Sequence, residues 1–152
     1  MITRENLIYS ASAAARILGI IYGQSRIVVR EWFSVIWVWV PGHRPRFMSK
    51  AVFKHHFVER RKAAARALRV TQHIMNPTAF TVRNEDKGST YTVQTIPTGL
   101  VCECEDYCNQ VQFLGQGCCK HNYAVLNHLG FKSLSSYLNA TKASTPTSVL
   151  AA

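Results

Sequence analysis

Acidic residues are scarce in this chain: eight Asp and Glu accompany eighteen Lys and Arg among 152 residues, giving a formal net charge of +10. The shortage is uneven. Residues 1–83 contain fourteen Lys and Arg but three Glu, whereas residues 84–152 contain four Lys and five acids. A surplus of positive charge favours a polyanionic partner, either nucleic acid or an anionic membrane surface. A basic targeting tail, or a surplus that only aids solubility, is the alternative interpretation.

Long apolar runs are also missing. The two most apolar stretches cover residues 17–22 and 32–40, and neither approaches the ~20 residues needed to span a bilayer. Arg26, Arg30 and Glu31 lie between them, and charges in the middle of one long span would be costly. The sequence therefore predicts no membrane-spanning helix.

Signatures of catalysis are weak. The only Gly-rich piece, residues 115–117, has no strand-to-helix context and does not resemble a phosphate-binding loop. Cys108 and His128 could suggest a thiol nucleophile, but no third residue that would orient them is apparent. We predict that the protein is not an enzyme.

Cysteine is absent from the first 101 residues, and all five cysteines lie between residues 102 and 119. An odd, tightly clustered set is a poor disulfide framework, whereas close C-x-C pairs in a reducing compartment are typical of metal ligands. We therefore expect an intracellular protein, cytoplasmic or nuclear, with organellar targeting by residues 1–47 left open.

Four residues form the pattern C-x-C, then fourteen residues, then C-x-H: Cys102, Cys104, Cys119 and His121. Three thiolates and one imidazole make a complete tetrahedral set for a structural zinc ion, and a closed set leaves no position for a catalytic water. A short segment with few large apolar residues needs such a metal to hold its shape.

Two further cysteines leave the third ligand open. Cys118 could replace Cys119, although the short C-x-H spacing would then be lost. Cys108 fits a loop thiol better than a ligand. Buried free thiols without a metal are the alternative for the whole set.

The pattern of apolar residues from residue 48 onward predicts an α+β fold. A basic helix is expected over 50–73, with Ser49 as its N-cap and Asn76-Pro77 as its end. Strands are expected at 79–82, 89–96 and 100–104, and a helix continues from Cys119 as far as Gly130. This gives a basic-helix region at 48–77, a zinc-finger domain with a short β-meander at 78–138 and a disordered tail at 139–152.

Residues 1–47 differ in composition from the rest of the chain and admit three interpretations. Their Arg-rich composition resembles an organellar transit peptide, and their aromatic residues could anchor the chain to a membrane surface. Alternatively, translation of the working protein starts at Met48.

The cysteine pattern resembles the SWIM zinc-finger family over about residues 78–130. The likeness extends to an aromatic–x–Val strand, to an acidic-aromatic step after C-x-C, and to C-K-H opening a helix with Ala. These features lie at residues 91–93, 102–107 and 119–125. The resemblance implies a ββα fold with zinc bound by Cys102, Cys104, Cys119 and His121. It also implies a role in binding DNA or proteins, as in chromatin-remodelling ATPases, transposases and bacterial or phage proteins.

Basic residues before the finger are candidates for phosphate contacts, because cations along one helix can follow a nucleic-acid backbone. The candidates are Lys54, Arg60, Arg61, Lys62, Arg66 and Arg69. We expect a zinc-binding module that binds DNA or RNA through this helix. The alternative is an adaptor that docks on a larger nucleic-acid-processing complex through protein contacts.

Overall fold

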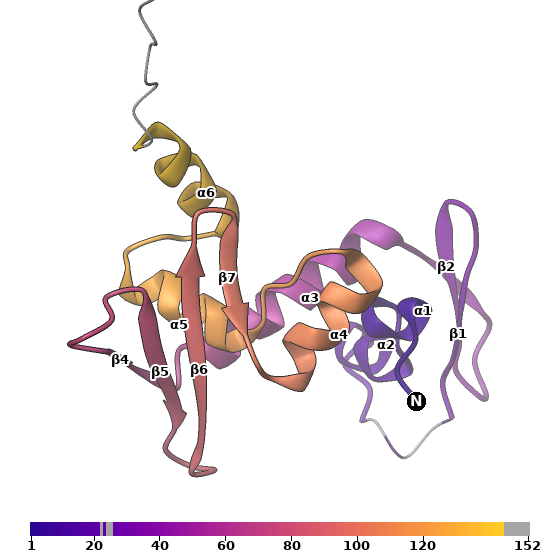
Figure 1. The fold of residues 1–152 in the computed structure, drawn as a ribbon. Coiled ribbons are helices and arrows are strands. Elements are labelled where there is room, and N and C mark those ends of the chain that lie inside the picture. Colours follow the sequence, from indigo (N-terminus) through magenta and orange to yellow (C-terminus); the bar gives the residue numbers. More distant parts are fainter. Residues whose placement is uncertain (22, 24–25, 145–152) are drawn as a thin grey trace, which may run out of the picture.

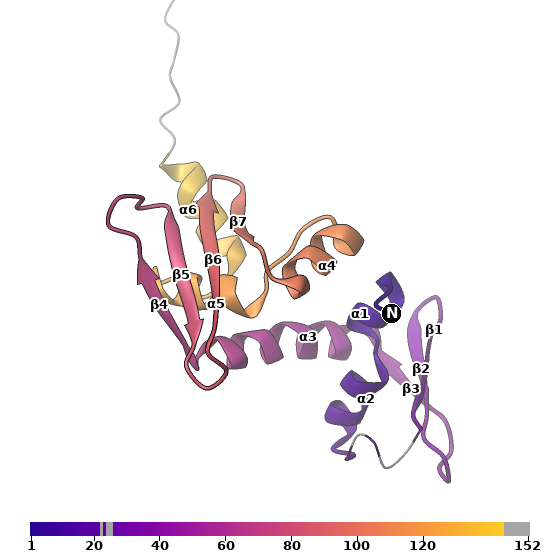
Figure 2. The same ribbon diagram turned by 60° about the horizontal axis from the view of Figure 1, so that its bottom comes forward.

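The computed structural model describes residues 1–144 except 22, 24 and 25. It is a mixed α+β fold with two antiparallel sheets, joined by one long helix, α3 (Lys50–Ala65). Figures 1 and 2 show α3 running from the smaller sheet to the larger one. Phe53 near its start and Ala65 at its end are buried in two different apolar cores.

The described residues among the first 49, together with the start of α3, form the smaller unit. Two helices, α1 (Arg4–Ile8) and α2 (Ala11–Leu18), accompany the strands β1 (Val28–Glu31), β2 (Val35–Trp39) and β3 (Arg46–Ser49), which pair in that order. In β2 the side chains alternate, so Ile36 and Val38 are buried against α2 and Phe53. A sheet in this segment was not expected from the sequence.

The larger sheet has the order β4-β5-β6-β7, all antiparallel. Its strands are β4 (Leu68–Gln72), β5 (Ala79–Asn84), β6 (Ser89–Ile96) and β7 (Gly99–Cys102). The expected meander is confirmed for β5, β6 and β7. The helices α4 (Glu105–Leu114), α5 (Lys120–His128) and α6 (Leu134–Ala143) come after the sheet, and α5 packs both on the sheet and on α3.

The expected helix over 50–73 is too long. Helix α3 ends at Ala65, and Leu68 and Val70 lie on β4, where Leu68 pairs with Asn84 and Val70 with Val82. Apolar residues two positions apart share one face of a strand, whereas on a helix they would point to nearly opposite sides. The pairing with β5 agrees with this spacing, so Arg69 is a strand residue.

The structure also corrects the expectations for the C-terminal tail and for the end of the third strand. The tail expected to be disordered from residue 139 is helical as far as Ala143, because Ser133 caps α6 and Tyr137 is buried, donating a hydrogen bond to the Ile96 carbonyl at 3.1 Å. The part of that tail beyond residue 144 lies outside the described residues. The third strand ends at Cys102, and Cys104 is the N-cap of α4.

Candidate metal centre

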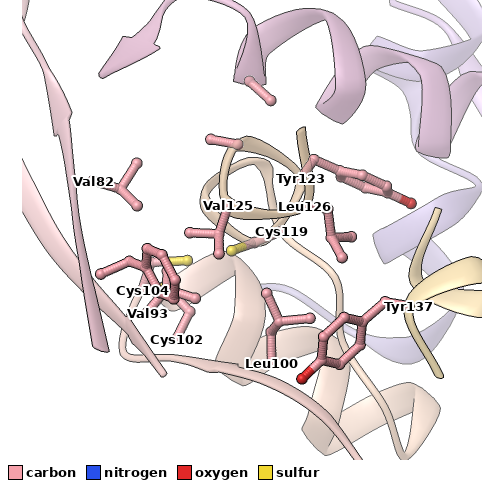
Figure 3. Packing of buried hydrophobic residues seen from close by; sticks show 13 residues of the cluster. Val82, Val93, Leu100, Cys102, Cys104, Cys119, Tyr123, Val125, Leu126 and Tyr137 are labelled. Atoms are coloured by element: carbon pink, nitrogen blue, oxygen red, sulfur yellow. The ribbon is translucent and has the colours of Figure 1, made fainter. Parts of the chain in front are cut away.

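Three separate elements supply the four expected ligands. Cys102 is the last residue of β7, Cys104 caps α4, Cys119 caps α5, and His121 lies in the first turn of α5. Figure 3 shows the three cysteines beside Val93 and Val125, in the core between the sheet and α5. The fourteen-residue spacer forms α4 and returns the chain to the site.

The geometry fits a tetrahedral ion. The four ligand atoms all lie within 4.8 Å of one another. The Sγ atoms of Cys102 and Cys119 lie 3.6 and 3.7 Å from Nδ1 of His121. Neighbouring ligand atoms of a zinc site with usual bond lengths are about 3.5–3.8 Å apart. All four residues are buried, none more than 4% exposed.

Local hydrogen bonds and one ring contact orient the ligands. The Tyr107 amide donates to Sγ of Cys104 at 3.4 Å, as a helix cap does. The Tyr91 ring stacks on His121 with centroids 4.4 Å apart. Asn122 is fully buried, with its Oδ1 3.5 Å from Sγ of Cys119, and its side-chain amide donates to the Leu100 carbonyl at 3.1 Å. Such outer contacts fix ligand orientation in metal sites.

The thiols influence one another's ionisation strongly. Hydrogen bonds from Cys102 and Cys119 lower the pKa of Cys104. The hydrogen bond with Cys104 raises the pKa of Cys102 to about 11, and hydrogen bonds with Cys102 and Cys104 raise the pKa of Cys119. One thiolate is therefore stabilised by two neighbouring thiols, and ionising all three requires positive charge at their centre. A divalent ion would supply that charge, and the soft Cys3His donor set suits zinc.

The two other cysteines lie outside this group. Cys108 is exposed, and its Sγ is 4.0 Å from the Glu103 carbonyl. Cys118 is half-buried, and burial raises its pKa to about 12. Neither is part of the four-residue cluster, so the geometry supports Cys119 as the third cysteine ligand.

A polar network ties α3 to the metal centre, and no pattern in the sequence indicated it. Arg61 binds both carboxylate oxygens of Asp106 on α4, with Nε 2.9 Å from Oδ2. Gln110, buried, donates to the same carboxylate at 3.1 Å and accepts from the Cys118 amide at 2.9 Å. The guanidinium also lies over the Phe57 ring, 3.5 Å from its centroid. Arg61 is thus a structural residue at this interface.

We expect Arg61→Ala to destabilise the chain by about 2 kcal/mol, because it removes charge-assisted hydrogen bonds and leaves the Asp106 carboxylate with fewer donors. Lys54→Ala is the matched control, since Lys54 is exposed on the same helix and should change stability by less than about 0.5 kcal/mol. Urea unfolding monitored by circular dichroism measures both. Equal stability of the two variants would show that the network contributes nothing.

The other candidate phosphate-binding residues differ in whether a carboxylate pairs with them. Lys62 pairs with Glu59 at 3.2 Å, and Arg69 with Glu85 at 3.9 Å. Among the described residues, no carboxylate partner is found for Lys54, Arg60 or Arg66, which are all exposed. Three of the six candidates are thus unpaired cations, two within α3 and one at its C-cap, and phosphate binding by any of the six stays a prediction.

Comparisons with protein-family models, with curated proteins and with solved structures gave no match to this chain. In the described part of the chain, every helix is too short or too polar to cross a membrane. What the structure itself establishes is a buried Cys3His cluster able to bind a metal ion.

Proposed function

We propose that this chain is a zinc-binding module of the SWIM type that binds nucleic acid through the basic surface beside its zinc site. The observation that carries the zinc part is the buried cluster with ligand-atom spacings suited to a tetrahedral ion. Four protein ligands would fill all the positions around the ion, so we assign the ion a structural and not a catalytic role.

The charge distribution supports a nucleic-acid partner. Residues 1–83 carry most of the Lys and Arg, and α3, which bears the unpaired cations, packs directly against α5 of the metal centre. Metal binding would therefore fix the position of the basic helix relative to the sheet.

The free thiols and the metal cluster fit a reducing, intracellular compartment.

One observation favours the adaptor alternative. Phe33 is fully exposed, and Trp32 and Phe47 are half or more exposed while their rings contact each other edge-to-face at 5.1 Å. Exposed aromatic residues that lie together are a common feature of protein-binding surfaces. This surface belongs to the small sheet, away from the metal centre.

A salt titration separates these functions. We expect a fluorescently labelled DNA duplex to bind the zinc-loaded chain at low ionic strength, with affinity falling steeply as salt is added, because phosphate contacts release counterions. Fluorescence anisotropy measures the slope. Absence of binding to both duplex and single strand at low salt would exclude the nucleic-acid function and leave the adaptor.

A further inference from the structure

A hollow of about 430 Å³ lies between α3, the turn that joins β5 to β6, and the beginning of α5. Strand pairing builds it: Leu68, just after α3, pairs with Asn84, and this brings the turn at 85–88 beside the end of the helix. Packing of α5 against α3 closes the other side. Its lining residues are Arg60, Arg61, Ala64, Lys87, Asp106 and Lys120.

The hollow concentrates uncompensated positive charge. The one carboxylate in the lining, Asp106, is already bound by Arg61. In the described part of the chain, Arg60, Lys87 and Lys120 have no carboxylate within ion-pair distance. Lys120 is also the first residue of α5, where the helix dipole adds further positive potential. Three cations from three elements therefore face one space.

The unpaired cations that belong to α3 and its C-cap do not form such a cluster with one another. Lys54, Arg60 and Arg66 are six residues apart, so each lies about 120° around the helix from the next. One nucleic-acid backbone cannot contact all three along a single face. The cations that lie near Arg60 are instead Lys87 and Lys120. Both are distant from Arg60 in sequence, so the cluster depends on the tertiary fold.

We propose that Arg60, Lys87 and Lys120 form a phosphate-binding pocket that holds a backbone phosphate of the nucleic acid. This inference rests on the proposed function and names the residues that carry it. The planar Arg fork can bind two phosphate oxygens at once, and the two Lys ammonium groups can neutralise the charge from the other sides. The neighbouring Arg61–Asp106 pair shapes the wall.

The test compares two double variants with the same loss of charge, in the full zinc-loaded chain. Arg60→Gln with Lys87→Gln removes two pocket cations and avoids residues next to the metal ligands. Lys132→Gln with Lys142→Gln removes two exposed lysines elsewhere, at the start and end of the α6 region. Anisotropy with a labelled DNA duplex gives the affinity and its dependence on salt concentration (the salt slope), and metal analysis checks that each variant keeps its zinc.

A second experiment tests the pocket without DNA. The wild-type chain is titrated with inorganic phosphate, and the shifts of its amide NMR signals are followed.

Each lost duplex phosphate contact is expected to reduce the salt slope by about 0.9 and the affinity at 0.1 M salt by roughly eightfold. Because the pocket holds one phosphate, the pocket variant should show a salt slope reduced in magnitude by about 0.9, and the control a much smaller change. Equal losses in the two variants, with zinc retained, would overturn the pocket while leaving nucleic-acid binding intact. If wild type binds no DNA or RNA but phosphate shifts the amides of Lys87 and Lys120, the pocket holds free phosphate and the proposed function fails. Absence of both responses overturns both.

Discussion

Removing the metal from the purified chain is expected to unfold the part of the structure that comes after β6. The ligands lie on β7, α4 and α5, so removing the ion removes the bonds that would tie these three elements together at one point. Structural zinc contributes an apparent ~10–16 kcal/mol in zinc-finger peptides, which matches or exceeds the whole stability of a typical domain, ~5–15 kcal/mol. Loss of this contribution should abolish cooperative folding of the larger unit.

Amide NMR spectra recorded before and after a strong chelator give the readout residue by residue. Signals from residues 99–128 should collapse to the unfolded range, and those of residues 28–49 should change little, because their core shares no buried residue with the metal centre. Adding zinc should restore the spectrum. A spectrum that survives exhaustive chelation unchanged would show that the larger core folds without a metal.

Phe53→Ala should give the largest effect of any single substitution in the smaller unit. Phe53 is fully buried, and its ring meets Tyr9 edge-to-face with centroids 5.7 Å apart. Truncating a buried Phe costs about 3–5 kcal/mol. Three of the other buried residues in that core are alanines, which contribute little area, so the loss should unfold the unit or come close to it.

Hydrogen exchange of the amides at 28–49 measures this effect, and zinc content reports on the other half of the molecule. The exchange should accelerate strongly in Phe53→Ala while zinc is retained. Val52→Ala, at the exposed neighbouring position of α3, is the control and should leave the exchange unchanged. Equal exchange in the two variants would show that Phe53 does not hold α3 to the small sheet.

Phe53 also bears on the three interpretations of residues 1–47. The residues that bury it include Ala13–Ala15, Ile36 and Val38, and a chain beginning at Met48 would lack them all. Such a chain should expose Phe53 at the start of α3. The transit-peptide and membrane-surface interpretations are not tested by this packing and stay predictions.

The metal cluster could be predicted from the sequence because its signal is local. Cysteine and histidine spacing identified Cys102, Cys104, Cys119 and His121, and the structure brings these four together. The β-meander was equally accessible, since the turn residues at 84–88 and 97–99 separate β-branched runs. In both cases the informative residues lie within about twenty positions of one another.

Features that depend on pairing between distant segments could not be predicted. The end of α3 is set by β4 joining β5, and the strand-like spacing of Leu68 and Val70 covers too few residues to place that boundary alone. Helix α4 is a separate omission, because Glu105 and Asp106 in its first turn and Gly115 at its C-cap are signals that the sequence already contained. The role of Arg61 is decided by Asp106, forty-five positions away, which no local pattern reveals. The pocket around Arg60 also depends on residues that are distant in sequence, Lys87 and Lys120.

We propose that the larger unit depends on one divalent ion held by three sulfurs and one imidazole, and the Cys3His cluster is the observation behind this proposal. Metal analysis combined with native mass spectrometry of the purified chain and of three Cys→Ser variants is the decisive measurement. One zinc per chain is expected in the wild type, in Cys108→Ser and in Cys118→Ser, and a large loss is expected in Cys104→Ser. A wild-type chain without stoichiometric metal, or full zinc occupancy in Cys104→Ser, would contradict a zinc site built from these four residues.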